Sequence, residues 1–147
     1  YLKNQATQSG AVFDYRDWHI PLGRRFRSLK LWSVIRYYGV EGLRKYIRKH
    51  IELSQKFSCW VKEDSRFQLM APAPLNLVCF RYKTSDKFNE LLLADLNNSG
   101  ELYLSHTRLA GHYTLRICIG QSYTTEKHVR QAWKTITEAV EKLEKSS

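Results

Sequence analysis

Apolar residues recur along the chain with two different periods, and the period changes near residue 64. Residues 1 to about 17 show no period and are rich in polar side chains, which predicts a loop. From 22 to 38, apolar positions at helical spacing predict a helix that Gly39 ends. A second, longer helix is predicted from Val40. Its inward stripe is Leu43, Ile47, Ile51, Ser54, Phe57 and Val61.

After Asp64 the apolar positions alternate, as they do in strands that bury one face. The alternation predicts strands at 67–71, 75–82, 101–105 and 113–119. Between the second and third strands, Ser85 or Asp86 is predicted to cap a helix that stops near Gly100. The inward side chains expected on that helix are Phe88, Leu91, Leu92 and Leu96. A final helix follows Thr124 or Thr125, with an inward stripe of Val129, Ala132, Trp133, Ile136, Val140 and Leu143.

The predicted order is two helices, then strand, strand, helix, strand, strand, helix. This order is typical of an α+β fold in which helices cover one face of a small, mainly antiparallel four-stranded sheet. We therefore divide the chain into a loop and connecting segment (1–21), a helical arm (22–64) and a small α+β domain (65–147).

The composition is that of a globular chain: 43% of the 147 residues are hydrophobic. Its apolar runs are too short to span a membrane, and no signal-like segment is present. Cys59, Cys79 and Cys118 are widely spaced, which predicts neither a disulfide framework nor a zinc site and is typical of a reducing, cytoplasmic setting. The five histidines are scattered without ligand spacing, so we expect no metal.

The formal net charge of +10 is concentrated between Arg16 and Lys56, a stretch that contains eleven basic and three acidic residues. One hypothesis is therefore a stand-alone basic module that binds nucleic acid or another anionic partner. No nucleic-acid motif accompanies the charge, so we favour exposed helix faces and pairing with a partner domain, with neither nucleic acid nor membrane as partner.

The segment from Asp14 to Trp32 combines arginines, aromatic residues and a constrained backbone. Pro21 fixes its own φ and extends the residue before it, whereas Gly23 lets the backbone approach a neighbour closely. Arg24, Arg25 and Arg27 offer planar donors suited to carboxylate or phosphate. This predicts a loop of defined conformation that leads into a helix.

The same segment resembles a known family. Asp14-Tyr15-Arg16-x-Trp18 and Ile20-Pro21-Leu22-Gly23-Arg24-Arg25-Phe26-Arg27-Ser28-Leu29-Lys30 are similar to a block of the group II pyridoxal-phosphate (PLP) decarboxylases, in particular the aromatic L-amino acid (dopa/tryptophan) decarboxylases. Tyr1-Leu2-Lys3 resembles the family's catalytic loop. The likeness continues through Tyr38-Gly39-Val40, Tyr46 to His50 and Leu77 to Arg81.

The resemblance implies the C-terminal domain of a fold-type I PLP enzyme, a cytoplasmic homodimer that converts an aromatic amino acid to an arylalkylamine and carbon dioxide. Tyr1 takes the position of the loop tyrosine that protonates the α-carbon after carbon dioxide leaves, across the dimer interface. In aldehyde-forming relatives a phenylalanine stands there. Leu22 and Gly23 fall at the pocket wall. The substrate stays open among dopa, tryptophan, 5-hydroxytryptophan, tyrosine, phenylalanine and histidine.

The family's cofactor lysine follows a histidine, and this chain has no His-Lys pair. By this resemblance, PLP is bound mainly by an upstream domain, and the chain alone is predicted to be inactive. Because the sequence begins with Tyr1 and not Met, we expect it to be a piece of a longer polypeptide. An alternative within the same family is a non-catalytic chain that pairs with an intact decarboxylase.

Overall fold

The computed structural model describes residues 26–146, the last of these by its backbone alone. The chain divides into two compact units, 1–39 and 40–147, and each is described by itself. Among the described residues, no helix combines the length and apolarity needed to cross a membrane.

The helix α2 (Arg27–Glu63) passes through Gly39, where the backbone is not helical. Gly39 has φ 66° and ψ 171°, a conformation that glycine adopts without the steric cost of a Cβ atom. The predicted end of the first helix at Gly39 is thereby confirmed, and Val40 starts the second helical segment as expected. Residues 22–25, the start of the first helix as predicted, lie outside the described part of the chain.

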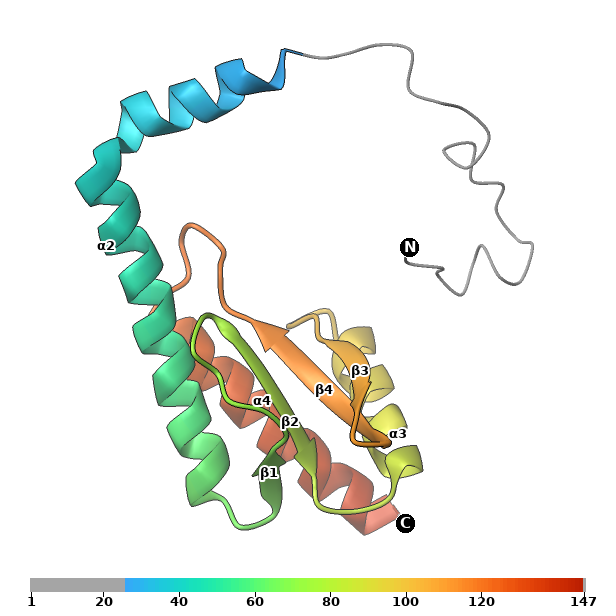
Figure 1. Cartoon of the computed structure of the whole chain (residues 1–147). Helices are drawn as coiled ribbons and strands as arrows, with labels where there is room; N and C mark the ends of the chain where they lie inside the picture. The colour runs from blue at the N-terminus through green and yellow to red at the C-terminus, as the bar shows by residue number, and fades with distance from the viewer. Residues whose placement is uncertain (1–25, 147) are drawn as a thin grey trace, which may run out of the picture. The chain divides into compact units, whose positions relative to one another are not determined.

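A four-stranded sheet forms the centre of the second unit, with the strand order β1-β2-β4-β3 and antiparallel pairing throughout. Its elements are β1 (Phe67–Leu69), β2 (Leu77–Tyr82), α3 (Asp86–Asn98), β3 (Ser105–Leu109), β4 (His112–Cys118) and α4 (Glu126–Ser146). Figure 1 shows α3 and α4 on the same side of this sheet. The predicted α+β fold with an antiparallel four-stranded sheet is therefore confirmed.

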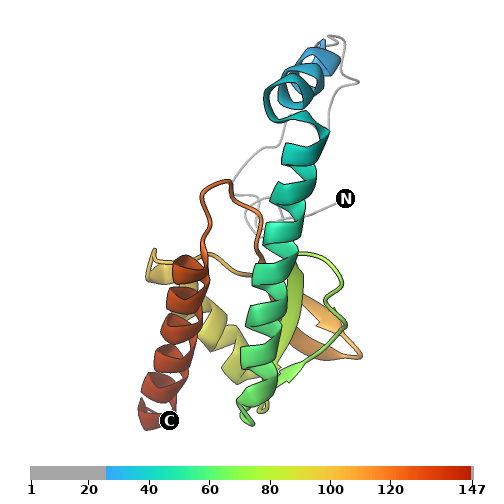
Figure 2. The same ribbon diagram turned by 90° about the vertical axis from the view of Figure 1, so that its left-hand side faces the viewer.

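The hydrophobic core lies between the sheet and the helices. Phe57 of α2 has its ring centroid 5.4 Å from that of Phe80 in β2 and 5.5 Å from that of Trp133 in α4. Phe67 of β1 adds a third ring at 5.0 Å from Trp133. Phe57 and Phe80 are fully buried, which locates the centre of the core between α2, α4 and β2 (Figure 2).

Two asparagines of α3, the buried Asn89 and the half-buried Asn97, hold the connections around this helix. Asn89 donates to the carbonyl of Tyr82 (3.1 Å) and accepts from its N–H (2.9 Å). Asn97 makes the same pair of bonds to Leu104, at 3.0 and 2.8 Å. Ser85 caps α3 as predicted, since its hydroxyl accepts from the N–H of Phe88. The two asparagine side chains of α3 thus satisfy backbone groups of Tyr82 and Leu104 that would otherwise need a neighbouring strand.

Three details of the sequence prediction are wrong. The third strand is Ser105–Leu109 and not 101–105, because Leu104 bonds to Asn97 and not to a strand. Leu91 is 52% exposed, because the buried face of α3 consists of Asn89, Leu92, Leu93 and Leu96. Ile47 is 55% exposed, because the buried residues of α2 begin only at His50.

The turn between β3 and β4 contains a strained residue. Ala110 and Gly111 both have positive φ, 48° and 80°, as the central residues of a type I′ hairpin turn do. Asparagine tolerates this conformation better than alanine, so we expect Ala110→Asn to stabilise the fold by about 0.5–1 kcal/mol. An upward shift of the urea midpoint is the measurement, and Ala110→Val should lower that midpoint. Equal midpoints for both variants would contradict this prediction.

Candidate functional site

The residues predicted to act on substrate, Tyr1, Leu22 and Gly23, lie outside the described part of the chain. The described part of the resembling block begins at Phe26. The roles of these three residues therefore stay predictions.

The first segment of α2 and the residue before it expose several large apolar side chains, which alternate with polar ones such as Lys30 and Arg36. Phe26, Leu31, Trp32 and Tyr37 are between 59% and 82% exposed. Arg36 stacks its guanidinium over the Trp32 ring, 5.9 Å from the ring centroid. Contiguous exposed apolar surface is typical of an interaction site. This segment therefore has the composition of a contact surface.

Within the second unit, no helix covers the sheet face opposite the core (Figure 1). The register places Leu77 and Cys79 of β2 beside Cys118 and Arg116 of β4 on that face. The remaining side chains of the same face are Gln68, Arg81, Ser105, Thr107, Leu109, His112 and Thr114. The charged side chains among them are Arg81 and Arg116, with no lysine, aspartate or glutamate, and this preference for arginine over the other charged residues is typical of interfaces.

Arg81 is the buried charge on the open sheet face, with 7% of its surface exposed. It donates to the carbonyl of Thr84 (2.5 Å) and to the carboxylate of Asp86 (3.2 Å). Its Nε–H is buried without a hydrogen-bond partner among the described residues. Arg81 belongs to the segment Leu77 to Arg81 that carried part of the family resemblance.

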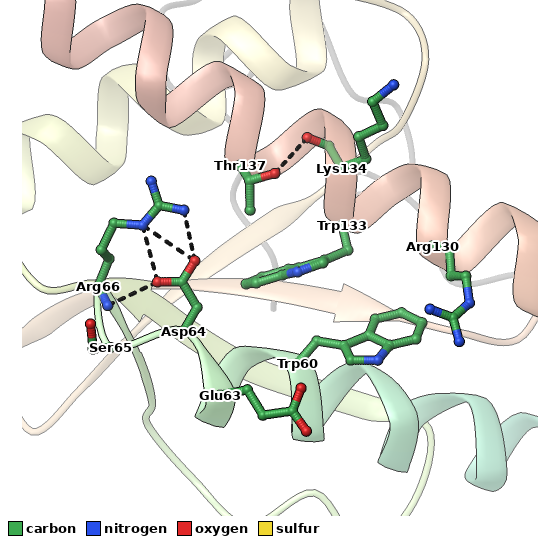
Figure 3. A pocket seen from close by; sticks show the side chains of 9 residues that line it. All are labelled: Trp60, Glu63, Asp64, Ser65, Arg66, Arg130, Trp133, Lys134 and Thr137. Atoms are coloured by element: carbon green, nitrogen blue, oxygen red, sulfur yellow. Dashed lines mark hydrogen bonds and ion pairs between the residues drawn. The ribbon is translucent and has the colours of Figure 1, made fainter.

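A groove lies between α2 and α4 in the second unit (Figure 3). Its volume is about 720 Å³, and it is open to solvent. The lining side chains are Trp60, Glu63, Asp64, Ser65, Arg66, Arg130, Trp133, Lys134 and Thr137. Sequence reasoning placed Trp133 in a core stripe and left Trp60 unassigned. It missed the groove because the two tryptophans belong to helices far apart in the sequence.

An ion pair between Asp64 and Arg66, in the turn that joins α2 to β1, lies at one end of the groove (Figure 3). Asp64 accepts from the Nε and NH2 groups of Arg66, at 3.0 and 2.7 Å, and from its backbone N–H at 3.0 Å. These hydrogen bonds from Arg66 hold the pKa of the Asp64 carboxyl below its usual value, although partial burial opposes them. The pair fixes the turn that leads from α2 into β1.

Among the described residues, the pKa of the Tyr82 phenol is shifted most strongly. Burial of the phenol, followed by its hydrogen bond to Glu144, raises the pKa of Tyr82 to about 12. The unfolded chain ionises this tyrosine near pH 10. Tyr82 therefore contributes stability that is fully present below pH 10 and is lost as the pH rises to about 12.

We expect this loss to be on the order of 2 kcal/mol between pH 10 and 12. The measurement is the difference in unfolding free energy between the native protein and Tyr82→Phe across that range. Because phenylalanine does not ionise, the difference should shrink with rising pH. A difference that stays constant would contradict the assignment of this pH dependence to Tyr82.

The described residues do not form a PLP site by themselves. Every lysine among them is exposed, whereas a cofactor lysine needs an enclosed site beside an acidic partner. Within residues 26–146 there is also no group of three His, Cys, Asp or Glu side chains placed to hold a metal ion. What the described chain offers is an apolar helical segment, an open sheet face and a groove.

Residues 1–83 match the family described as "Pyridoxal-dependent decarboxylase conserved domain". This match covers more than half of the chain, and the chain belongs to that family, whose members are pyridoxal-dependent enzymes.

Similar proteins include aromatic amino acid decarboxylases and an aldehyde synthase. Tryptophan decarboxylase 2 of Oryza sativa subsp. japonica is 47% identical over 97% of this chain and 30% of that protein. Aromatic-L-amino-acid decarboxylase of Sus scrofa is 49% identical over 92% of this chain and 28% of that protein. Phenylacetaldehyde synthase of Arabidopsis thaliana is 50% identical over 94% of this chain and 30% of that protein.

The fold agrees with these relatives. The crystal structure of Oryza sativa TDC with PLP and tryptamine superposes with a TM-score of 0.78 and 39% identity. That match covers 97% of this chain and 31% of the other. The chain thus spans about three tenths of the length of the relatives it matches.

Proposed function

We propose that this chain is the C-terminal portion of a PLP-dependent aromatic L-amino acid decarboxylase, which converts an aromatic amino acid to an arylalkylamine and carbon dioxide. One observation carries the proposal: decarboxylases of aromatic amino acids align with more than nine tenths of the chain at 47–49% identity. The resemblance of the segment from Asp14 to Lys30 supports it independently of the fold.

Tyr1 is the residue of this chain that we assign to the chemistry. In the resembled enzymes the loop tyrosine delivers a proton to the α-carbon after carbon dioxide has left. A phenol suits this task because it is a weak acid, with a pKa near 10, that can be reprotonated from solvent. PLP, when bound to the full-length protein, supplies the electron sink that makes loss of carbon dioxide possible.

Leu22 and Gly23 are assigned to the wall of the substrate pocket. A glycine at this position leaves space that a side chain would otherwise fill. In the resembled family glycine accompanies indole and catechol substrates, whereas serine accompanies tyrosine or histidine. Gly23 therefore favours a larger aromatic side chain such as that of tryptophan, 5-hydroxytryptophan or dopa.

The partner of the open sheet face is proposed to be the upstream PLP-binding domain of the same enzyme. The open face around Cys79 and Cys118 has arginine but no lysine, aspartate or glutamate, and the first segment of α2 exposes large apolar side chains; both features are typical of interfaces. The enzyme is proposed to be a cytoplasmic homodimer in which Tyr1 acts across the subunit interface. The chain alone is expected to be inactive, because it lacks the cofactor lysine.

The other hypotheses have less support. No observation on the described residues favours nucleic acid as the partner of the basic arm, and we do not propose it. A non-catalytic chain that pairs with an intact decarboxylase would show the same fold and the same relatives. It differs from our proposal only in having no upstream half of its own, so it would show no activity without its partner.

Amine formation by the full-length protein tests the proposal. The protein, loaded with PLP, is given each of the six candidate amino acids in turn, and the amines are separated by chromatography. We expect tryptamine, serotonin or dopamine to dominate over histamine, as Gly23 requires. No amine from any of the six amino acids would contradict the proposed activity.

A further inference from the structure

We propose that Gly39 is a positioning residue for the substrate pocket, because its backbone sets the direction in which the first segment of α2 leaves the second unit. This segment, from Arg27 to Tyr38, follows Leu22 and Gly23 in the sequence, the two residues that we assign to the pocket wall. The inference rests on the proposed function, since it names a further residue on which that pocket depends. Gly39 acts through the segment and not by contact with the substrate.

The conformation of Gly39 is one that glycine alone adopts readily. Its φ of 66° and ψ of 171° lie in a region where a Cβ atom collides with the backbone. Within α2, Gly39 is the residue with non-helical dihedral angles, and both of its neighbours are helical. Two dihedral angles of a single residue therefore decide how the first segment of α2 is directed relative to the second.

Close packing does not explain this glycine. Among the described residues, a Cβ atom added to Gly39 would meet nothing within 4 Å. Gly120 shows the contrast, because a Cβ atom there would lie 3.1 Å from the side-chain nitrogen of Asn76. Gly120 is thus needed for the space that it leaves, whereas Gly39 is needed for its dihedral angles.

The break at Gly39 would disappear if a helix-forming residue replaced the glycine. A break leaves backbone N–H and C=O groups without their partners inside the helix, so a continuous helix is the favoured alternative. Alanine prefers the helical conformation more strongly than glycine does. The residues on both sides of position 39 are already helical. We therefore expect Gly39→Ala to join the two segments and to redirect the first one.

The second segment of α2 is fixed within the second unit, so a change at Gly39 alters the course of the first segment. Buried side chains between Leu53 and Val61 hold the second segment in the hydrophobic core. His50 adds a hydrogen bond, which its Nε2 donates to the carbonyl of Gln121 (3.2 Å). The division of the chain into two compact units falls directly after Gly39. The pocket wall, which precedes the first segment in the sequence, follows any change in its direction.

The first measurement is a distance in the full-length, PLP-loaded protein, and it does not depend on activity. Nitroxide labels are attached to a ketone-bearing amino acid placed at Lys30 and at Tyr103, both of which have exposed side chains. Pulsed electron spin resonance gives the distance between them. Lys30 lies nine positions before Gly39, about 13 Å along a helix. With a lever of this length, we expect Gly39→Ala to shift the distance by about 5 Å or more.

The second measurement is the kinetics of amine formation. Because the pocket wall is displaced, we expect kcat/KM of Gly39→Ala to fall at least about tenfold, chiefly through KM, and the preference among the six amino acids to change. Gly100→Ala is the matched control. Gly100 also has a positive φ, 74°, and open space around an added Cβ atom, but it follows α3. Its variant should keep the native distance and the native kcat/KM.

A variant of opposite chirality separates the effect of dihedral angles from the effect of size. Gly39→D-Ala, introduced with a chemically acylated suppressor tRNA, carries the same extra methyl group as Gly39→Ala. A D-residue accepts positive φ because its steric preferences are mirrored. We expect the D-alanine variant to restore the native distance and the native kcat/KM, including in the case that Gly39→Ala does not fold.

Several results would overturn the proposal. One is an unchanged distance in folded Gly39→Ala, since another feature would then direct the first segment. A shifted distance with native kcat/KM and native substrate preference would show that the pocket does not depend on that direction. Equal losses in Gly100→Ala, or in Gly39→D-Ala, would assign the effect to strain or to size. If the native protein formed no amine, the proposed function would fail, whereas the distance would still decide whether Gly39 directs the segment.

Discussion

Replacing Tyr1 with phenylalanine in the full-length protein is expected to change the product from an amine to an aldehyde. Without the phenolic proton donor, the α-carbon is open to attack by oxygen. The amino acid, oxygen and water then give aldehyde, carbon dioxide, ammonia and hydrogen peroxide. The similar proteins include both amine-forming and aldehyde-forming enzymes at 47–50% identity. Overall similarity therefore does not decide the outcome, and Tyr1 is the residue that we expect to decide it.

The products are measured together: amine and aldehyde by chromatography, peroxide by a coupled peroxidase assay. We expect amine output to fall by at least about tenfold in Tyr1→Phe, in line with the loss of a general acid, while peroxide rises with aldehyde. Tyr103→Phe is the control, because Tyr103 is 83% exposed. Unchanged amine output in Tyr1→Phe would show that Tyr1 is not the proton donor.

Replacing Asn89 with alanine is expected to destabilise the second unit by about 3 kcal/mol. Asn89 is fully buried, and its carboxamide satisfies the N–H of Tyr82. Alanine leaves that N–H without a partner and opens a cavity, and both effects are costly in a packed interior. The carbonyl of Tyr82 keeps its bond from the N–H of Thr84, so it adds little to the loss.

Native-state hydrogen exchange at the amides of β2 and β4 in the full-length protein measures this change directly. Asn98→Ala is the matched control, since Asn98 lies on the same helix but is exposed. We expect the control to change the opening free energy by less than about 0.5 kcal/mol. Equal losses in the two variants would mean that the Tyr82 contact contributes nothing beyond helix propensity.

Local patterns predicted most of the elements. The stripe of α4 from Val129 to Leu143 is buried or half-buried as expected, because its helical spacing is regular over five turns. The break at Gly39 and the cap at Ser85 were also correct, since each depends on the chemistry of one residue. The family resemblance read from the sequence is confirmed by the match over residues 1–83.

The failures have a common physical cause, which is competition from contacts that are distant in the sequence. Asn89 takes a core position because it bonds to β2, and this turns Leu91 outward. Leu104 bonds to Asn97, so the strand begins at Ser105 and not at the predicted residue 101. The groove could not be predicted at all, because it needs α2 and α4 to be packed side by side.

The central claim is that this chain completes a PLP-dependent aromatic amino acid decarboxylase. The most direct test combines three readings on protein purified from its source: intact mass, visible absorbance of bound PLP, and carbon dioxide released from carboxyl-labelled aromatic amino acids. We predict a mass well above 17.4 kDa, bound cofactor, and carbon dioxide and amine in equal amounts. A chain of 17.4 kDa without cofactor, or a PLP-loaded protein that releases no carbon dioxide, would contradict the account.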